Sequence, residues 1–186
     1  MSFLWTAHRF AGGALALDVA NSVVLRFDPG RRIDRFADAA AMDTFAAAAN
    51  LYGAERERFG PLLPAPPENH KSLLALREAI DRHFRKQVQD DARPDLLADL
   101  LETIAAVLRR TKNDHDHVAL DVATAHSALS LVTNPEPDRL KICPNCEWLF
   151  FDRSRNRSRT WCDMAVCGNR TKAKRHYRRN KEGVQP

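Results

Sequence analysis

The sequence has no long hydrophobic run. Its most apolar stretch near the start, FAGGALAL, is short and is followed at once by Asp18. A membrane-spanning helix needs about 20 apolar residues, so we expect no span and no membrane partner. The polar DVANS that comes next offers no small-residue cleavage site of a signal peptide, and we therefore expect a cytoplasmic protein.

Familiar catalytic motifs are also missing. The sequence contains no Gly-rich phosphate loop, no nucleophile elbow and no H-E-x-x-H helix. We find no internal repeat either. These absences argue against an enzyme, and a catalytic site in the N-terminal region is an alternative without a motif to support it.

Charge is unevenly distributed along a chain of otherwise globular composition, with 44% hydrophobic and 28% charged residues. The segment 139–186 has 13 Lys or Arg against 4 Asp or Glu, a net charge of +9, whereas residues 1–138 have 16 against 20, a net charge of −4. A mildly acidic body with a strongly basic tail indicates a polyanionic partner for the tail, either nucleic acid or an acidic membrane surface. A basic terminus that only aids solubility is the simpler alternative.

Cysteine is scarce, and its four copies lie close together. Cys143 and Cys146 form CPNC, and after fifteen residues Cys162 and Cys167 form CDMAVC. Two close pairs separated by about 15 to 20 residues are typical of a four-thiolate zinc site. Four sulfur ligands leave a tetrahedral zinc no position for water, so we expect one structural Zn²⁺ and no metal catalysis.

Two other uses of the cysteines are weaker. A thioredoxin-like dithiol at CPNC would need a βαβ pattern around it, and two disulfides would need an oxidising compartment. The spacer favours zinc, because WLFF and TWC predict two short strands around a polar turn. The sequence after Cys167, GNRTKAKRHYRRNK, predicts a basic helix.

The run ICPNCEWLFFDRSRNRSRTWCDMAVCGNRTKAKRHYRR resembles the CGNR zinc finger, named for Cys167, Gly168, Asn169 and Arg170. The stretch LALDVANSV, Leu15 to Val23, is similar to the opening of the ABATE domain, which usually precedes this finger. The resemblance implies a bacterial, stress-induced transcription regulator with a DNA-binding finger.

The rest of the chain predicts helices. Apolar side chains at three- or four-residue steps indicate helices over about 69–89 and from Pro94 to Leu108, and two more are expected over about 34–50 and 118–132. We therefore expect a mainly α N-terminal domain, residues 1–134, with a short β element near its start. A small zinc-binding β-hairpin/helix module of treble-clef or ribbon type, residues 135–186, follows a proline-containing linker.

Asp18 and Asn21 are polar residues inside the apolar stretch LALDVANSV, on one side of a helical turn. In one interpretation Asp18 caps a helix that follows a short strand, and Asn21 satisfies neighbouring backbone groups. In the other, both residues line a pocket for a small-molecule effector. We favour the structural interpretation.

The basic residues of the module are expected to bind nucleic acid, DNA rather than RNA. Ala173 and Tyr177 are expected to face the hairpin aromatics, which would leave the cations of the helix outward. The expected nucleic-acid ligands are Arg153, Arg155, Arg157, Arg170, Lys172, Arg175, Arg178 and Arg179. The N-terminal domain would sense an effector or form a homo-oligomer. Two alternatives stay open: a finger that contacts protein or is purely structural, and an N-terminal small-molecule-binding domain without DNA binding.

Overall fold

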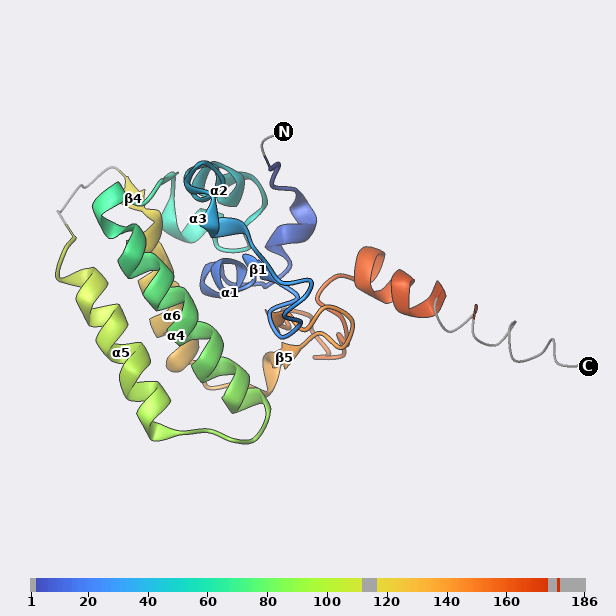
Figure 1. Cartoon of the computed structure of the whole chain (residues 1–186). Helices are drawn as coiled ribbons and strands as arrows, with labels where there is room; N and C mark the ends of the chain where they lie inside the picture. Colours follow the sequence, from blue (N-terminus) through green and yellow to red (C-terminus); the bar gives the residue numbers. More distant parts are fainter. Residues whose placement is uncertain (1–2, 112–116, 174–176, 178–186) are drawn as a thin grey trace, which may run out of the picture.

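The computed structural model describes residues 3–111, 117–173 and 177, and within them the chain is mostly helical (Figure 1). None of the helices in these residues is long and apolar enough to cross a membrane. The α-helices are α1 (Leu15–Ala20), α2 (Ala39–Tyr52), α3 (Arg56–Phe59), α4 (His70–Val88), α5 (Pro94–Leu108) and α6 (Leu120–Val132). Single 3-10 turns form η1 (Ala7–Phe10), η2 (Arg35–Ala37), η3 (Pro67–Asn69) and η4 (Pro137–Arg139).

The strands are short and pair in twos. Antiparallel pairs form between β1 (Val23–Val24) and β2 (Ile33–Asp34), and between β5 (Leu140–Ile142) and β6 (Leu149–Phe151). The third pair is parallel, between β3 (Leu62–Leu63) and β4 (Val118–Ala119). The predicted fold class, a mainly α protein with a short β element near its start and a small C-terminal hairpin, is confirmed.

The four longest helices lie close to their predicted ranges. In α4, Leu76, Ile80 and Phe84 are buried on one face, as their spacing predicts. Helix α2 begins later than expected because two aspartates cap separate turns. The Asp34 carboxylate accepts a hydrogen bond from Phe36 N at the start of η2, and the Asp38 carboxylate accepts one from Ala40 N at the start of α2.

Helix α1 lies at the centre of the molecule, and every one of its residues is buried. It packs against α4, α6 and β6. The expectation that a strand precedes a helix capped by Asp18 is wrong. Asp18 lies inside α1, and the strand, β1, comes after the helix. Other elements surround α1, so every side of the helix is buried. Apolar residues on both sides of Asp18 suit such a buried helix.

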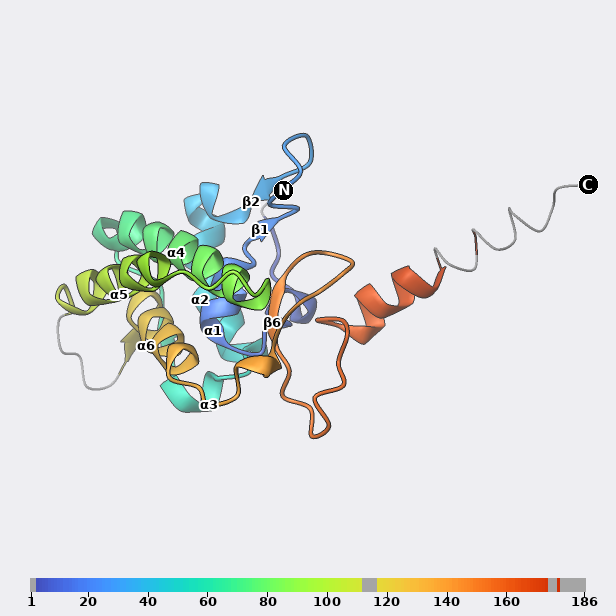
Figure 2. The ribbon, with the colours of Figure 1, turned by 90° about the horizontal axis from the view of Figure 1, so that it is seen from below.

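The described residues from Leu140 onward, which we call the C-terminal module, share a core with the helices. Leu140 and Leu149 lie in one buried cluster with Leu17 of α1 and Ile80 of α4. Figure 2 shows β6 beside α1. The predicted boundary at residue 134 therefore separates two parts that pack as one core, and the division into two domains stays a prediction.

A glycine pair makes this close packing possible. Phe151 N donates a hydrogen bond to Gly12 O at 2.7 Å, so the backbone before α1 lies directly on β6. Gly13 has a φ of +76°, and a Cβ atom there would lie 2.6 Å from Phe151 O. Any other residue at Gly13 would therefore push the C-terminal module away from α1.

Candidate metal centre

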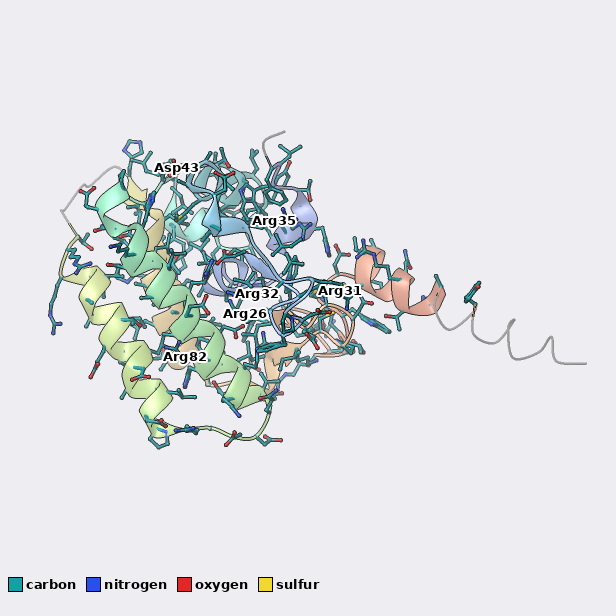
Figure 3. The ribbon with its side chains drawn as sticks, in the orientation of Figure 1. Arg26, Arg31, Arg32, Arg35, Asp43 and Arg82 are labelled. Atoms are coloured by element: carbon teal, nitrogen blue, oxygen red, sulfur yellow. The ribbon has the colours of Figure 1, made fainter. Side chains whose placement is uncertain are left out.

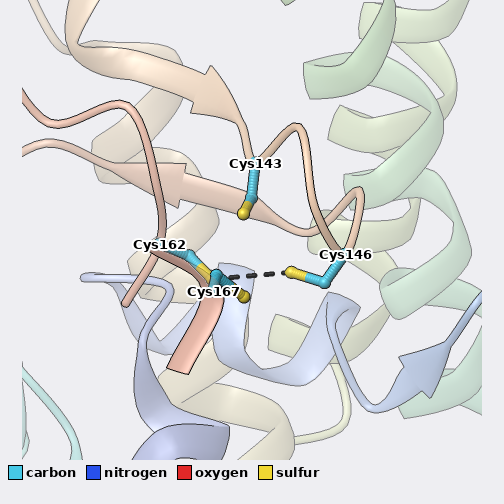
Figure 4. A group of neighbouring side chains, drawn as sticks. All are labelled: Cys143, Cys146, Cys162 and Cys167. Carbon is cyan, nitrogen blue, oxygen red and sulfur yellow. Dashed lines mark hydrogen bonds between the residues drawn. The ribbon is translucent and has the colours of Figure 1, made fainter. Parts of the chain in front are cut away.

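The structure brings the four cysteines together (Figure 4). All four sulfur atoms lie within 4.8 Å of one another. The Sγ atoms of Cys146 and Cys162 are 3.5 Å apart, and those of Cys162 and Cys167 are 3.7 Å apart. A tetrahedral zinc with Zn–S bonds of about 2.3 Å separates its sulfurs by about 3.8 Å, so the cluster has the size of a zinc site.

The first cysteine pair is the turn of the β5–β6 hairpin. Cys143 N donates to Trp148 O at 2.9 Å, and Glu147 N donates to Cys143 O at 2.8 Å. The predicted pairing of WLFF with TWC is wrong, because β6 pairs with Leu140–Ile142 instead. The short CPNC turn joins these two strands directly, whereas TWC is separated from β6 by a loop.

That loop is fixed by a buried carboxylate, Asp152. Its oxygens accept hydrogen bonds from Lys141 Nζ at 2.8 Å and from the backbone N–H groups of Ser154 and Arg159 at 2.9 Å each. Burial alone would raise the pKa of Asp152, but these hydrogen bonds outweigh it and hold the pKa well below its usual range. The loop therefore returns the chain to the metal centre at Cys162.

The second cysteine pair is held by a capped π-helical turn, Met164–Gly168. The Asp163 carboxylate accepts hydrogen bonds from Ala165 N at 2.8 Å and Val166 N at 3.2 Å. Cys167 N donates to Asp163 O at 2.9 Å, which points Cys167 back toward Cys162. Gly168 is buried, and a Cβ atom there would lie against the Met164 side chain, which would have to move aside to admit a larger residue.

The chemistry of the sulfurs also fits a metal ion. Three of the cysteines are buried, and none of the four is in a disulfide. Hydrogen bonds from the thiols of Cys146 and Cys162 lower the pKa of Cys143, and the same contacts raise the pKa of Cys146 and Cys162. The sulfurs thus lie close enough to interact, and a divalent cation would bind them by displacing the thiol protons.

Comparison with protein families agrees with this geometry. Residues 139–180 match the family model described as the CGNR zinc finger. The C-terminal module is a CGNR zinc finger. Its four cysteines lie together to hold one metal ion, consistent with one structural zinc. The comparison with curated proteins finds no relative of the chain. The resemblance of Leu15 to Val23 to the ABATE domain stays a prediction.

The N-terminal turn η1 covers the zinc finger. His8 Nδ1 lies 2.8 Å from a carboxylate oxygen of Asp163, and the His8 ring stacks on Trp148 with centroids 5.5 Å apart. The Arg9 guanidinium lies over the same indole, 5.6 Å from its centroid. Ala11 and Val24 complete the apolar shell around the cysteines. No local pattern in the sequence predicts this contact, because η1 and Trp148 are far apart in the chain.

Asp18 and Asn21 both lie at the contact between α1 and the finger. Asn21 Nδ2 donates to Leu149 O at 2.8 Å, and Asn21 Oδ1 accepts from Leu149 N at 3.1 Å. Asp18 Oδ1 accepts from Gly12 N at 2.8 Å. The two side chains are 1% and 4% exposed, so an effector would reach them only after the finger had moved away from α1.

Two of the three predicted arginines in the DRSRNRS loop contact the chain itself. Arg153 Nε donates to Gly13 O at 2.5 Å. Arg157 forms ion pairs with Asp138 and Glu136. Arg155 is exposed, and the described part of the chain offers it no ion pair. The loop therefore presents one uncommitted guanidinium where the sequence predicted three.

The helix after Cys167 extends away from the body (Figure 1). Arg170 and Lys172 are exposed and make no ion pair with a described residue. Arg175, Arg178 and Arg179 lie outside the described residues. The expectation that Ala173 and Tyr177 face the hairpin is wrong, because Ala173 is exposed and Tyr177 is 70% exposed. The hairpin aromatics instead pack on the cysteines and η1.

Proposed function

We propose that this protein is a transcription regulator whose zinc finger binds nucleic acid, DNA in preference to RNA. The helical N-terminal part would sense a small molecule or form a homo-oligomer. The observation that supports the proposal most strongly is the set of exposed, unpaired cations on the finger. Arg155, Arg170 and Lys172 have no acidic partner among the described residues, although acidic residues pair with most arginines elsewhere in the body.

The zinc centre would supply rigidity for this contact. The loop that carries Arg155 ends at Cys162 and the helix that carries Arg170 follows Cys167, so one ion would hold the two cationic elements in a fixed relation. Arginine suits phosphate because its planar guanidinium donates two parallel hydrogen bonds. The zinc itself would have no catalytic role, because four sulfurs leave no ligand position for water or substrate.

A triple variant of the finger tests this function. Arg155→Ala/Arg170→Ala/Lys172→Ala should weaken binding to every DNA sequence. The slope of the logarithm of the binding constant against the logarithm of salt concentration should become shallower by about three, because each phosphate contact contributes about 0.9 to it. The matched control is Lys71→Ala/Arg109→Ala/Arg110→Ala, which removes the same charge from exposed positions on α4 and at the end of α5.

Fluorescence anisotropy with a labelled DNA duplex, and with an RNA duplex of the same sequence, measures both effects. Equal binding by the finger variant and the control variant would contradict the proposal. The finger would then be a protein-contact or structural module, a role that the shared core of Leu140, Leu149 and the helices also fits.

A further inference from the structure

Two arginines of the N-terminal part lie beside the finger. Arg9 belongs to η1 and Arg35 to η2. Both guanidinium groups lie over the ring of Phe3, at 5.7 Å for Arg9 and 4.1 Å for Arg35 from the guanidinium carbon to the ring centroid. Arg9 also lies over Trp148 of the finger. Aromatic rings thus hold both cations in place.

Neither guanidinium has an acidic partner. Among the described residues, the guanidinium groups of Arg9 and Arg35 take part in no ion pair or hydrogen bond, and Arg35 Nε is buried without a hydrogen-bond acceptor. By contrast, Arg77 and Arg26 of the same region pair with Asp34 and Glu78. The acidic residues near β1 and β2 are therefore used by other arginines, and Arg9 and Arg35 keep unsatisfied donors.

Arg9 also lies near the start of the finger helix, because Trp148, beneath its guanidinium, is in one buried cluster with Cys167. Burial lowers the pKa of Arg9, and the charges of Arg35 and then Arg170 lower it further. Arg170 is itself exposed and unpaired in the described part of the chain. Figure 3 shows Arg31, Arg32 and Arg35 on the segment that contains β2. Arg35 and Arg170 thus both add positive charge around Arg9, and only the charge of Cys146 opposes them, an arrangement that an anion stabilises.

We infer that Arg9, Arg35 and Arg170 form one surface that binds phosphates of the nucleic acid held by the zinc finger. This inference rests on the proposed function and extends it to the N-terminal part of the chain. The partner is a polyanion because separate elements supply cations that neighbouring phosphates of one strand would satisfy together. Nucleic acid would therefore contact both parts of the protein and stabilise their packing.

The salt dependence of DNA binding tests this surface. The variant Arg9→Gln/Arg35→Gln should bind a labelled DNA duplex with a log–log salt slope shallower by about two than that of the parent, between about 50 and 200 mM salt. The control variant Arg109→Gln/Arg110→Gln removes the same charge at the far end of α5 and should keep the slope of the parent. Arg9→Lys/Arg35→Lys, which keeps the charge, should restore the slope.

A chemical measurement on the unaltered protein covers the case in which the glutamine variant fails to fold, as judged by its zinc content. Phenylglyoxal modifies accessible arginines, and bound DNA should protect Arg9, Arg35 and Arg170 but leave Arg109 reactive. Unchanged slope in the folded glutamine variant, or unprotected Arg9 and Arg35 in the complex, overturns this inference and leaves the proposed function intact. Absence of DNA binding by the parent overturns both.

Discussion

Asn21 and Leu149 are joined by two hydrogen bonds although 128 positions separate them in the sequence. The Asn21 side chain binds both the N–H and the C=O of Leu149, as a neighbouring strand would. It therefore extends the β5–β6 hairpin and fastens the zinc finger to α1. This single contact links the two sequence motifs, LALDVANSV and WLFF, that carry the resemblance to known families.

Asn21→Ala should destabilise the protein by about 1–3 kcal/mol, because two buried backbone groups lose their partners. Chemical unfolding measures the loss. Asn50 provides a matched control, since its side chain makes the same pair of hydrogen bonds with Leu62, away from the finger. Asn21→Ala should also speed the loss of zinc to a chelator, and Asn50→Ala should not. Equal zinc retention in the two variants would show that Asn21 does not support the finger.

Zinc removal should unfold more than the finger. We expect one zinc per chain by elemental analysis and, because Leu140 and Leu149 belong to the core of α1 and α4, a fall in the melting temperature of the helices after chelation. Structural zinc typically supplies on the order of 10 kcal/mol to folding. A protein purified without zinc, or a Cys143–Cys146 disulfide in reducing buffer, would contradict the metal site. Unchanged melting of the helices after chelation would contradict the shared core.

Asp18 should make stability depend on pH. Burial raises the pKa of Asp18 well above its usual range, with the Gly12 hydrogen bond and Arg153 opposing the shift only in part. Because its pKa is raised in the folded protein, protonated Asp18 contributes stability. This contribution is fully present below about pH 4, the carboxyl pKa in the unfolded chain, and is lost as the pH rises through the folded pKa. Asp18→Asn keeps an acceptor for Gly12 N–H and should be more stable than the parent at neutral and alkaline pH.

Asp18→Ala is the companion variant. It removes the same charge but leaves Gly12 N–H without a partner, so it should lie below Asp18→Asn in stability at every pH. Melting curves across the pH range measure both variants. If the melting temperatures of the parent and of Asp18→Asn changed with pH in parallel, Asp18 would not be the group that makes stability depend on pH.

Replacement of Glu147 by glycine should stabilise the protein. It follows the CPNC turn with a φ of 61°, a left-handed conformation that side chains disfavour. Glu147→Gly relieves this strain and keeps the backbone carbonyl that accepts a hydrogen bond from Arg85, so we expect a gain of about 0.5–1 kcal/mol. Asp90→Gly, at a φ of 55° after α4, should give a similar gain. Only Glu147→Gly should also slow zinc release. A loss of stability in Glu147→Gly would contradict the strain.

The sequence predicted the parts of the fold that depend on local patterns. The period of Leu76, Ile80 and Phe84 indicated α4, and the spacing of the two cysteine pairs indicated the zinc ligands. Long-range contacts were not predictable from local patterns. WLFF and TWC are both short apolar runs, and only the CPNC turn decides that β6 pairs with Leu140–Ile142.

The arginines illustrate the same limit in the candidate site. Arg153, Arg155 and Arg157 look alike in DRSRNRS, yet distant groups, Gly13 O and the acids before β5, engage two of them. Conversely, the net negative charge of the N-terminal part gave no indication that Arg9 and Arg35 form a cationic surface. Their neighbours Glu78 and Asp34 are already paired, so local charge differs from the charge summed along the chain.

The salt dependence of DNA binding by the zinc-loaded chain of 186 residues tests the central claim most directly. If the exposed cations of the finger neutralise about four to five phosphates, the logarithm of the binding constant should fall with the logarithm of salt concentration with a slope near about −4. Binding that is absent at about 50 mM salt, or that stays constant between about 50 and 200 mM, would contradict a nucleic-acid-binding finger.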